Sequence, residues 1–197
     1  MICYRFATYA TPLRTVPAWQ SARFSSGDED EPTQYLCLHP LGPLAELMRG
    51  ADLRTSEQVR AVRTRTWALR VPVEDLLEIT FDTAEEFGIT ADQLIGDDHR
   101  PCQQLAERLR RRIAGAVVPS AALPGTRNVV LFGARVAAPY LTEPVSALDI
   151  PASMTADGGR PPVSLMSLVR FIGSTHPALA AWREGATFQF EEPDWAI

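Results

Sequence analysis

Five side chains in the first two thirds of the chain have types that could do chemistry together: Arg5, Arg23, Tyr35, Glu46 and Ser120. A guanidinium group binds a phosphate through parallel hydrogen bonds, and an aromatic ring stacks on a flat heterocycle. A carboxylate stabilises the positive charge that develops when a glycosidic bond to such a heterocycle breaks. A hydroxyl hydrogen-bonds phosphate, ribose or amide groups. Together these types suit a dinucleotide with two phosphates, a flat leaving group and a glycosidic bond to that group.

The sequence around these residues fits such roles. Arg5 lies in the middle of an apolar strand, where burying a charge without a partner is costly. Glu46 is flanked by Leu44 and Leu47, beside the apolar face of a short helix, and Ser120 follows a proline at a strand end. No recognisable motif places a histidine to activate Ser120, so a nucleophilic serine is not expected. Each residue taken singly also occurs as ordinary structure, and the prediction therefore depends on their shared order.

The elements that must position these residues are predicted from residue patterns. Apolar and aromatic runs indicate strands over 2–8, 34–39, 64–73, 76–81, 116–118, 128–132 and 187–190. Caps and helical spacing indicate helices over 44–49, 83–88, 90–96, 101–114, 164–172 and 177–183. Tyr35 begins the second strand, and Arg23 lies in a long connection over 9–33, which makes that connection a candidate substrate loop. The mixed order of elements favours an α+β class.

We expect one domain with a mixed or antiparallel β core and a C-terminal extension. Residues 1–138 would form the catalytic domain, and residues 139–197 would pack on it, because a tail of that length is too short to fold alone. Residues 151–162 are rich in proline and glycine and are expected to form a linker or strap.

Charge and hydropathy exclude several classes of protein. A formal net charge of −5 and a pI near 5.2 argue against direct nucleic-acid binding. The basic cluster of Arg108, Arg110, Arg111 and Arg112 would spread over more than one helix face, so a solvated surface is expected there. No apolar run approaches the length of a membrane span, and no apolar leader follows the N-terminus. The chain is therefore expected to be cytoplasmic.

The cysteines and histidines indicate neither a disulfide framework nor a metal site. The three cysteines are widely spaced and include no CxxC pair, and Cys3 and Cys37 lie in apolar runs as small buried hydrophobes. The three histidines have no metal-ligand spacing.

Several short segments in a fixed order resemble the RES-domain family of bacterial toxins, which are named for an arginine, a glutamate and a serine. The segments are Tyr4-Arg5-Phe6, Ala22-Arg23-Phe24, Gln34-Tyr35-Leu36-Cys37-Leu38, Ala45-Glu46, Val118-Pro119-Ser120 and Asn128-Val129-Val130-Leu131-Phe132. The 11-residue step from Tyr35 to Glu46 adds to the match, which runs from about Ile2 to Arg135. Gly96-Asp97-Asp98 with Cys102-Gln103 also resembles a stretch of mycobacterial members that consume NAD.

The resemblance implies an ADP-ribosyltransferase-like fold and an attack on NAD⁺, which would be a substrate and not a prosthetic group. It implies that Glu46 and Arg5 are catalytic residues, with Glu46 driving the loss of nicotinamide. Arg5 and Arg23 would bind the diphosphate, Tyr35 would stack on the nicotinamide, and Ser120 would bind the nucleotide. It also implies an Xre-type antitoxin as partner, usually in a multimeric complex.

The sequence leaves the reaction open among three alternatives. The acceptor of ADP-ribose could be water or phosphate, which depletes NAD⁺, or a protein side chain. The third alternative is a non-catalytic module that binds NAD or ADP-ribose and has lost the reaction. Two departures from the family pattern keep it open: Ser21-Ala22-Arg23-Phe24 replaces the usual Gly-Gly-Arg-Trp, and Phe6 replaces a tyrosine.

Overall fold

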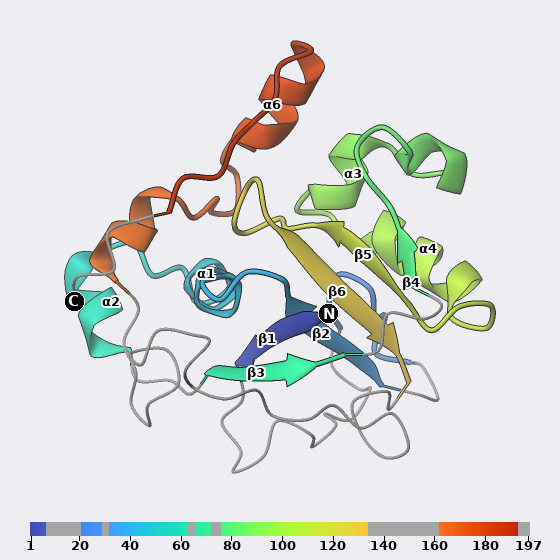
Figure 1. Ribbon diagram of the computed structural model, residues 1–197, viewed down its shortest axis with the longest axis horizontal. Coiled ribbons are helices and arrows are strands. Elements are labelled where there is room, and N and C mark those ends of the chain that lie inside the picture. The colour runs from blue at the N-terminus through green and yellow to red at the C-terminus, as the bar shows by residue number, and fades with distance from the viewer. Residues whose placement is uncertain (7–20, 29–31, 63–65, 72–75, 134–161, 193–197) are drawn as a thin grey trace.

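The fold is built on one six-stranded sheet whose strand order is β3-β1-β2-β6-β5-β4 (Figure 1). The computed structural model describes residues 1–6, 21–28, 32–62, 66–71, 76–133 and 162–192. The strands are β1 (Ile2–Phe6), β2 (Thr33–Cys37), β3 (Thr66–Arg70), β4 (Leu76–Glu78), β5 (Gly115–Pro119) and β6 (Arg127–Phe132). Neighbouring strands are antiparallel except β4 and β5, which are parallel, so the sheet is mixed.

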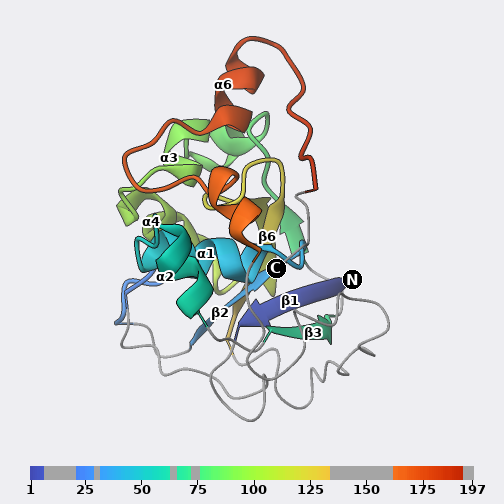
Figure 2. The same ribbon diagram turned by 90° about the vertical axis from the view of Figure 1, so that its left-hand side faces the viewer.

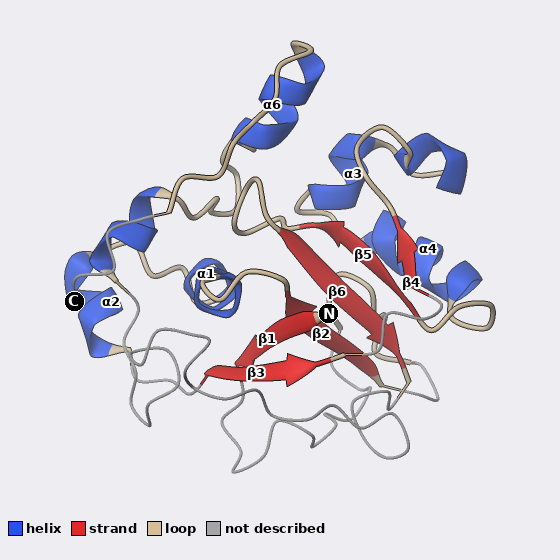
Figure 3. Cartoon of the chain, in the orientation of Figure 1, coloured by secondary structure: helices blue, strands red, loops and turns tan. Residues whose placement is uncertain are grey.

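The two faces of the sheet carry separate hydrophobic clusters, because successive strand residues point to opposite faces. On β6, Val130 and Phe132 belong to a cluster under η1 (Ala84–Phe87), α3 (Ala91–Ile95) and α4 (Arg100–Leu109). Val129 and Leu131 belong to a cluster on the opposite face. Figure 3 shows α3 and α4 beside β4 and β5, and the first helix beside the other end of the sheet.

Helix α1 (Gly42–Gly50) carries Glu46 and packs closely on β2. Pro43 suits its first turn, and one side of the helix is buried with Leu44, Ala45 and Met48. A Cβ added at Gly42 would lie 2.5 Å from Cys37 Cβ, so only glycine allows the helix to start this near the strand. The position of Glu46 relative to the sheet is therefore set by the contact between Gly42 and Cys37.

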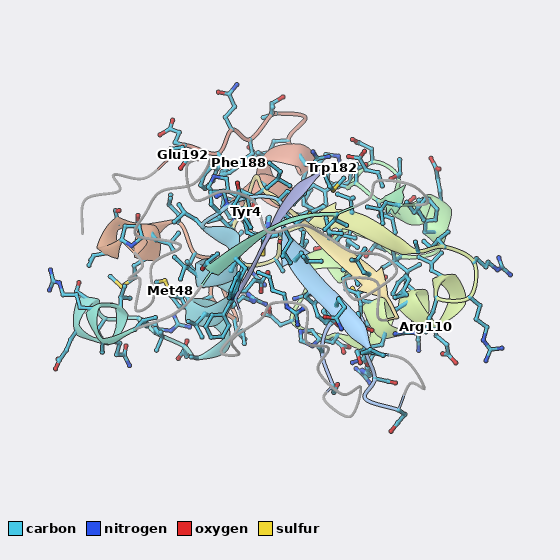
Figure 4. All side chains as sticks on the ribbon, turned by 60° about the horizontal axis from the view of Figure 1, so that its bottom comes forward. Tyr4, Met48, Arg110, Trp182, Phe188 and Glu192 are labelled. Atoms are coloured by element: carbon cyan, nitrogen blue, oxygen red, sulfur yellow. The ribbon has the colours of Figure 1, made fainter. Side chains whose placement is uncertain are left out.

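Residues 162–192, called the C-terminal segment below, run along the helices on one side of the molecule (Figure 2). The segment contains η3 (Val163–Ser167) and α6 (Pro177–Arg183). Leu165, Val169 and Phe171 share a buried cluster with α1 and with α2 (Ser56–Ala61). Further on, Trp182 Nε1 donates to Asp82 at 2.7 Å, and His39 Nε2 lies 2.6 Å from the carboxylate of Glu192 (Figure 4).

The α+β prediction is confirmed, and most elements lie where the sequence placed them, with several differences. The helix predicted over 101–114 ends at Leu109, and the strand predicted over 76–81 ends at Glu78. Residues 164–172 form helix only as far as Ser167, residues 187–190 are not a strand, and α2 was not predicted. The boundary at 138/139, most of the connection over 9–33 and all but the last residue of the predicted linker over 151–162 lie outside the described residues.

Candidate active site

One cavity of about 810 Å³ opens over the face of the sheet that carries Tyr35 and Asn128. Its lining includes Arg5, Arg23, Tyr35 and Glu46, so four of the five side chains singled out in the sequence meet there. Small-molecule and cofactor sites occupy roughly 300–1,000 Å³, so a dinucleotide is within the range of this cavity.

Glu46 is held by an amide from the centre of the sheet. Asn128 Nδ2 donates to Glu46 Oε1 at 2.8 Å, and both side chains are only partly buried. Asn128 lies on β6 opposite Cys37 of β2, against which α1 starts, so helix and strand bring the two side chains together. This contact fixes the direction of the carboxylate. Asn128 appeared in the sequence only as the start of a strand, and nothing there indicated this role.

Arg23 lies in a tight turn that α4 holds against the sheet. Ala22 and Ser25 exchange backbone hydrogen bonds of 2.8 and 3.2 Å across the turn. Gln103 Nε2 lies 2.9 Å from the carbonyl oxygen of Ala22 and 3.1 Å from that of Ser25. The hydroxyl of Tyr35 accepts the backbone N–H of Phe24 at 3.0 Å. Tyr35 therefore lines the cavity and also fixes the turn that carries Arg23.

Arg110, one of the four arginines of the basic cluster, also supports this turn. The expectation that the whole cluster forms a solvated surface is therefore corrected. Arg110 Nη2 donates to Thr33 Oγ1 at 2.9 Å and to the carbonyl oxygen of Phe24 at 3.2 Å (Figure 4). Its guanidinium lies 5.0 Å from the ring centre of Phe132, a cation–π contact. Helical periodicity could not indicate these contacts, because they come from strands and turns distant in sequence.

Ala22, which replaces the second glycine before Arg23, does not strain the turn. It is not among the described residues with a positive φ, the conformation that favours glycine. The backbone of this turn therefore accepts the residues that this chain has.

The environment of Arg23 combines burial with opposite charge. Burial lowers the pKa of Arg23, and the neighbouring Cys102 and Glu46 partly offset this effect. Arg23 Nη1 donates to the carbonyl oxygen of Gly96 at 2.6 Å, which ties the arginine to the turn between α3 and α4. Burial also lowers the pKa of His99 in the cavity wall, as do the charges of Arg23 and Arg49.

Arg5 lies on β1, at a position whose side chain alternates away from that of Tyr4. It lines the cavity and is 9% exposed. Because side chains alternate along a strand, Arg5 lies on the same face of the sheet as Cys3. Tyr4 pairs with Cys37 and therefore lies on the opposite face, which carries Tyr35 and Asn128. Tyr4 and Phe6 also line the cavity, so the cavity extends along β1.

Ser120 is fully buried next to the cavity wall and is not part of the lining, although Pro119 and Ala121 are. Its hydroxyl accepts the backbone N–H groups of Leu123 at 3.0 Å and Ala122 at 3.3 Å. In this structure the hydroxyl of Ser120 therefore shapes the turn after β5.

Two charged residues of the lining, Arg49 and Asp97, were not singled out as functional. Arg49 Nη2 donates to Asp97 Oδ1 at 2.6 Å, across the gap between α1 and the turn before α4. The stretch Gly96-Asp97-Asp98 was noted only for its resemblance. The signal that could have marked Arg49 is an arginine that follows Glu46 by three residues and so lies on the same helix face.

The described residues place no three metal-ligating side chains (His, Cys, Asp or Glu) where they could hold a metal ion. Within the same residues no helix is both long enough and apolar enough to span a membrane.

Comparisons with known proteins identify the family and the fold of this chain. A family model described as RES domain matches residues 2–153. Among solved structures, the crystal structure of the M. tuberculosis MbcT–MbcA toxin–antitoxin complex contains a similar chain, with a TM-score of 0.61 and 20% sequence identity. The similarity covers 74% of this chain and 81% of that chain, and at this identity it establishes the fold. The comparison with curated proteins found no match.

Proposed function

The chain belongs to the RES-domain family, and we propose that it is the toxin of a toxin–antitoxin pair and depletes NAD⁺ by cleaving the bond between nicotinamide and ribose. The observation that carries the proposal is the convergence of Arg23, Tyr35 and Glu46 on one cavity, with Asn128 donating to Glu46. These residues come from a loop, two strands and a helix, so the fold and not local sequence brings them together.

Each side chain then has a defined task. The guanidinium group of Arg23, together with Arg5, which also lines the cavity, binds the diphosphate, whose charge complements the two cations. Tyr35 contributes its ring, which stacks on the nicotinamide, while its hydroxyl accepts the backbone N–H of Phe24. Ser120 supports the wall of the nucleotide site through its turn.

Glu46 acts on the reacting bond. The C–N bond breaks with its electron pair leaving on neutral nicotinamide, and positive charge develops on the ribose. The carboxylate stabilises that charge, and the hydrogen bond from Asn128 keeps it directed at the cavity. Water then forms the new C–O bond and releases one proton, which gives ADP-ribose. Phosphate in place of water would give ADP-ribose 1″-phosphate.

An antitoxin partner follows from the same proposal. The structural neighbour was crystallised as a toxin–antitoxin complex, and we extend that arrangement to this chain, with an Xre-type antitoxin that restrains the enzyme in the cytoplasm. A protein as acceptor of ADP-ribose is the alternative outcome of the test.

Purified protein incubated with NAD⁺ and a cell lysate tests the reaction. Release of nicotinamide together with free ADP-ribose, or with its phosphate ester when phosphate is present, is the expected result. ADP-ribose bound to a discrete protein band would replace depletion by protein modification. NAD⁺ that stays intact under all conditions would overturn the proposal.

A further inference from the structure

We propose that residues 162–176 of the C-terminal segment, which lie beyond the match to the family model, form part of the active site, with Asp97 and Arg170 as positioning residues for Arg23 and Arg49. The segment adds Ile172 to the lining of the cavity. It also holds the turn and the helix that present the cavity arginines. The kinetic part of the test rests on the proposed function, and the spectroscopic part does not.

Asp97 joins three parts of the chain through one carboxylate. Its Oδ1 accepts from Arg49 Nη2 of α1 and from Arg170 Nη1 of the C-terminal segment, both at 2.6 Å. Its Oδ2 accepts the backbone N–H of Gly173 at 2.8 Å. Burial alone would raise the pKa of Asp97, but these hydrogen bonds outweigh burial and lower the pKa to about 2. The carboxylate is therefore ionised throughout the physiological range.

Both arginines in this cluster are nearly inaccessible and have further acceptors. The side chain of Arg49 is 6% exposed and that of Arg170 is 8% exposed. Arg49 Nη1 donates to the backbone oxygen of Arg170 at 2.9 Å, and Arg170 Nε donates to the carbonyl oxygen of Ser174 at 2.9 Å. Removing one partner of a buried ion pair leaves the charge of the other uncompensated, which is strongly destabilising. The pairing of Asp97 with Arg49 and Arg170 therefore holds these three side chains in one geometry.

The cluster reaches Arg23 through one peptide unit. The carbonyl oxygen of Gly96, the residue before Asp97, accepts from Arg23 Nη1 at 2.6 Å. Arg170 Nη1 also lies 3.3 Å from the carbonyl oxygen of Ile95, so the C-terminal segment contacts this turn on both sides of Gly96, at Ile95 and at Asp97. A displacement of Asp97 therefore moves the acceptor that orients Arg23.

The same segment also fixes the strand end that carries Ser120. His176 accepts the N–H of Leu179 on Nδ1 at 3.2 Å, which leaves the hydrogen on Nε2. His176 Nε2 then donates to the carbonyl oxygen of Ser120 at 3.0 Å. Buried packing of Leu165 and Val169 against the helix of Glu46 completes the contact. Three elements that line or adjoin the cavity thus depend on residues 162–176.

The test uses the full chain with Arg170→Met, Arg170→Lys and Asp97→Asn, and Arg183→Met as the matched control. Arg183 belongs to the same segment and pairs with Asp92, but its side chain is 54% exposed. Thermal unfolding selects the variants that remain folded, and Asp97→Asn, which keeps size and shape, provides a second route if Arg170→Met does not fold.

The first measurement is the side-chain NMR signal of ¹⁵N-labelled Arg23, assigned by its loss in Arg23→Lys. The hydrogen bond to Gly96 should give Arg23 distinct Nη signals in the wild type and in Arg183→Met. These signals should merge through free rotation in Arg170→Met and Asp97→Asn, and Arg170→Lys should restore them in part. Unchanged Arg23 signals in both folded variants would overturn the inference, whether or not the protein consumes NAD⁺.

The second measurement separates KM from kcat for NAD⁺. A mispositioned phosphate-binding arginine should raise KM by about tenfold or more with little change in kcat, because it binds ground state and transition state alike. A merely structural role would lower the active fraction and hence kcat, with KM unchanged, and would contradict the inference. A wild-type protein that leaves NAD⁺ intact would instead refute the proposed function.

Discussion

Replacing Asn128 by leucine is expected to lower the rate of NAD⁺ cleavage far more than it lowers the free energy of unfolding. Leucine has a similar size but lacks the N–H that donates to Glu46 at 2.8 Å. A hydrogen bond to a charged group contributes about 1.5–3 kcal/mol, and 1.36 kcal/mol corresponds to a tenfold change in rate. The predicted loss in kcat/KM is therefore about 10- to 150-fold.

The free energy of unfolding should change by no more than about 1 kcal/mol, because two effects of similar size oppose each other. The variant loses the hydrogen bond to Glu46, but it also removes Asn128 Oδ1, a buried acceptor with no hydrogen-bond partner in the described part of the chain. Initial rates of nicotinamide release and urea unfolding measure the two quantities.

Arg127→Met is the matched control for this prediction. Arg127 is the neighbouring residue on β6, and it pairs at the surface with Glu78 at 2.6 Å. Its replacement should leave both quantities near wild type. An Asn128→Leu variant with wild-type kcat/KM would refute the reasoning that the amide directs the carboxylate.

Substitutions of Glu46, Asp97 and Gly42 give three further predictions. Glu46→Gln should abolish NAD⁺ loss and growth inhibition with an unchanged Tm, and a fully toxic variant would remove Glu46 from the mechanism. The pKa of Asp97 is about 2 in the folded chain, below its ordinary value of 3.8, so its stabilising effect is complete above about pH 4 and is lost towards pH 2. The difference in urea midpoint between the wild type and Asp97→Asn should therefore shrink as the pH falls from about 4 to about 2. A difference that does not depend on pH would contradict the assigned contacts. Gly42→Ala should destabilise the chain by about 1–3 kcal/mol and reduce activity, because the added Cβ meets Cys37 at 2.5 Å and displaces the helix that carries Glu46. A Tm equal to that of the wild type would contradict this prediction, because the helix would then shift without cost.

Local pattern was sufficient for most of the fold. Apolar runs placed the central strands, and proline with helical spacing placed α4 and α6. The predicted strand over 187–190 does not form, although Phe188 and Phe190 are apolar at alternate positions, because no sheet edge pairs with it among the described residues. Pairing partners are a property of the whole fold, and alternation alone does not reveal them.

The candidate site was predicted less completely. Side chains with a distinctive type in a fixed order, such as Arg23 and Glu46, could be found from sequence. Asn128, Asp97 and Arg170 could not, because their significance comes from contacts between residues 48 to 82 positions apart. Ser120 was found by its motif, but only the structure shows that its hydroxyl accepts from the following turn.

The most direct test of the account follows nicotinamide release from NAD⁺ by the purified chain, with and without inorganic phosphate, beside Glu46→Gln. The account predicts that the wild type releases nicotinamide and forms ADP-ribose or its phosphate ester, while the variant releases none. NAD⁺ that is bound but intact, or equal release by Glu46→Gln, would contradict the central claim that this carboxylate drives cleavage of the glycosidic bond.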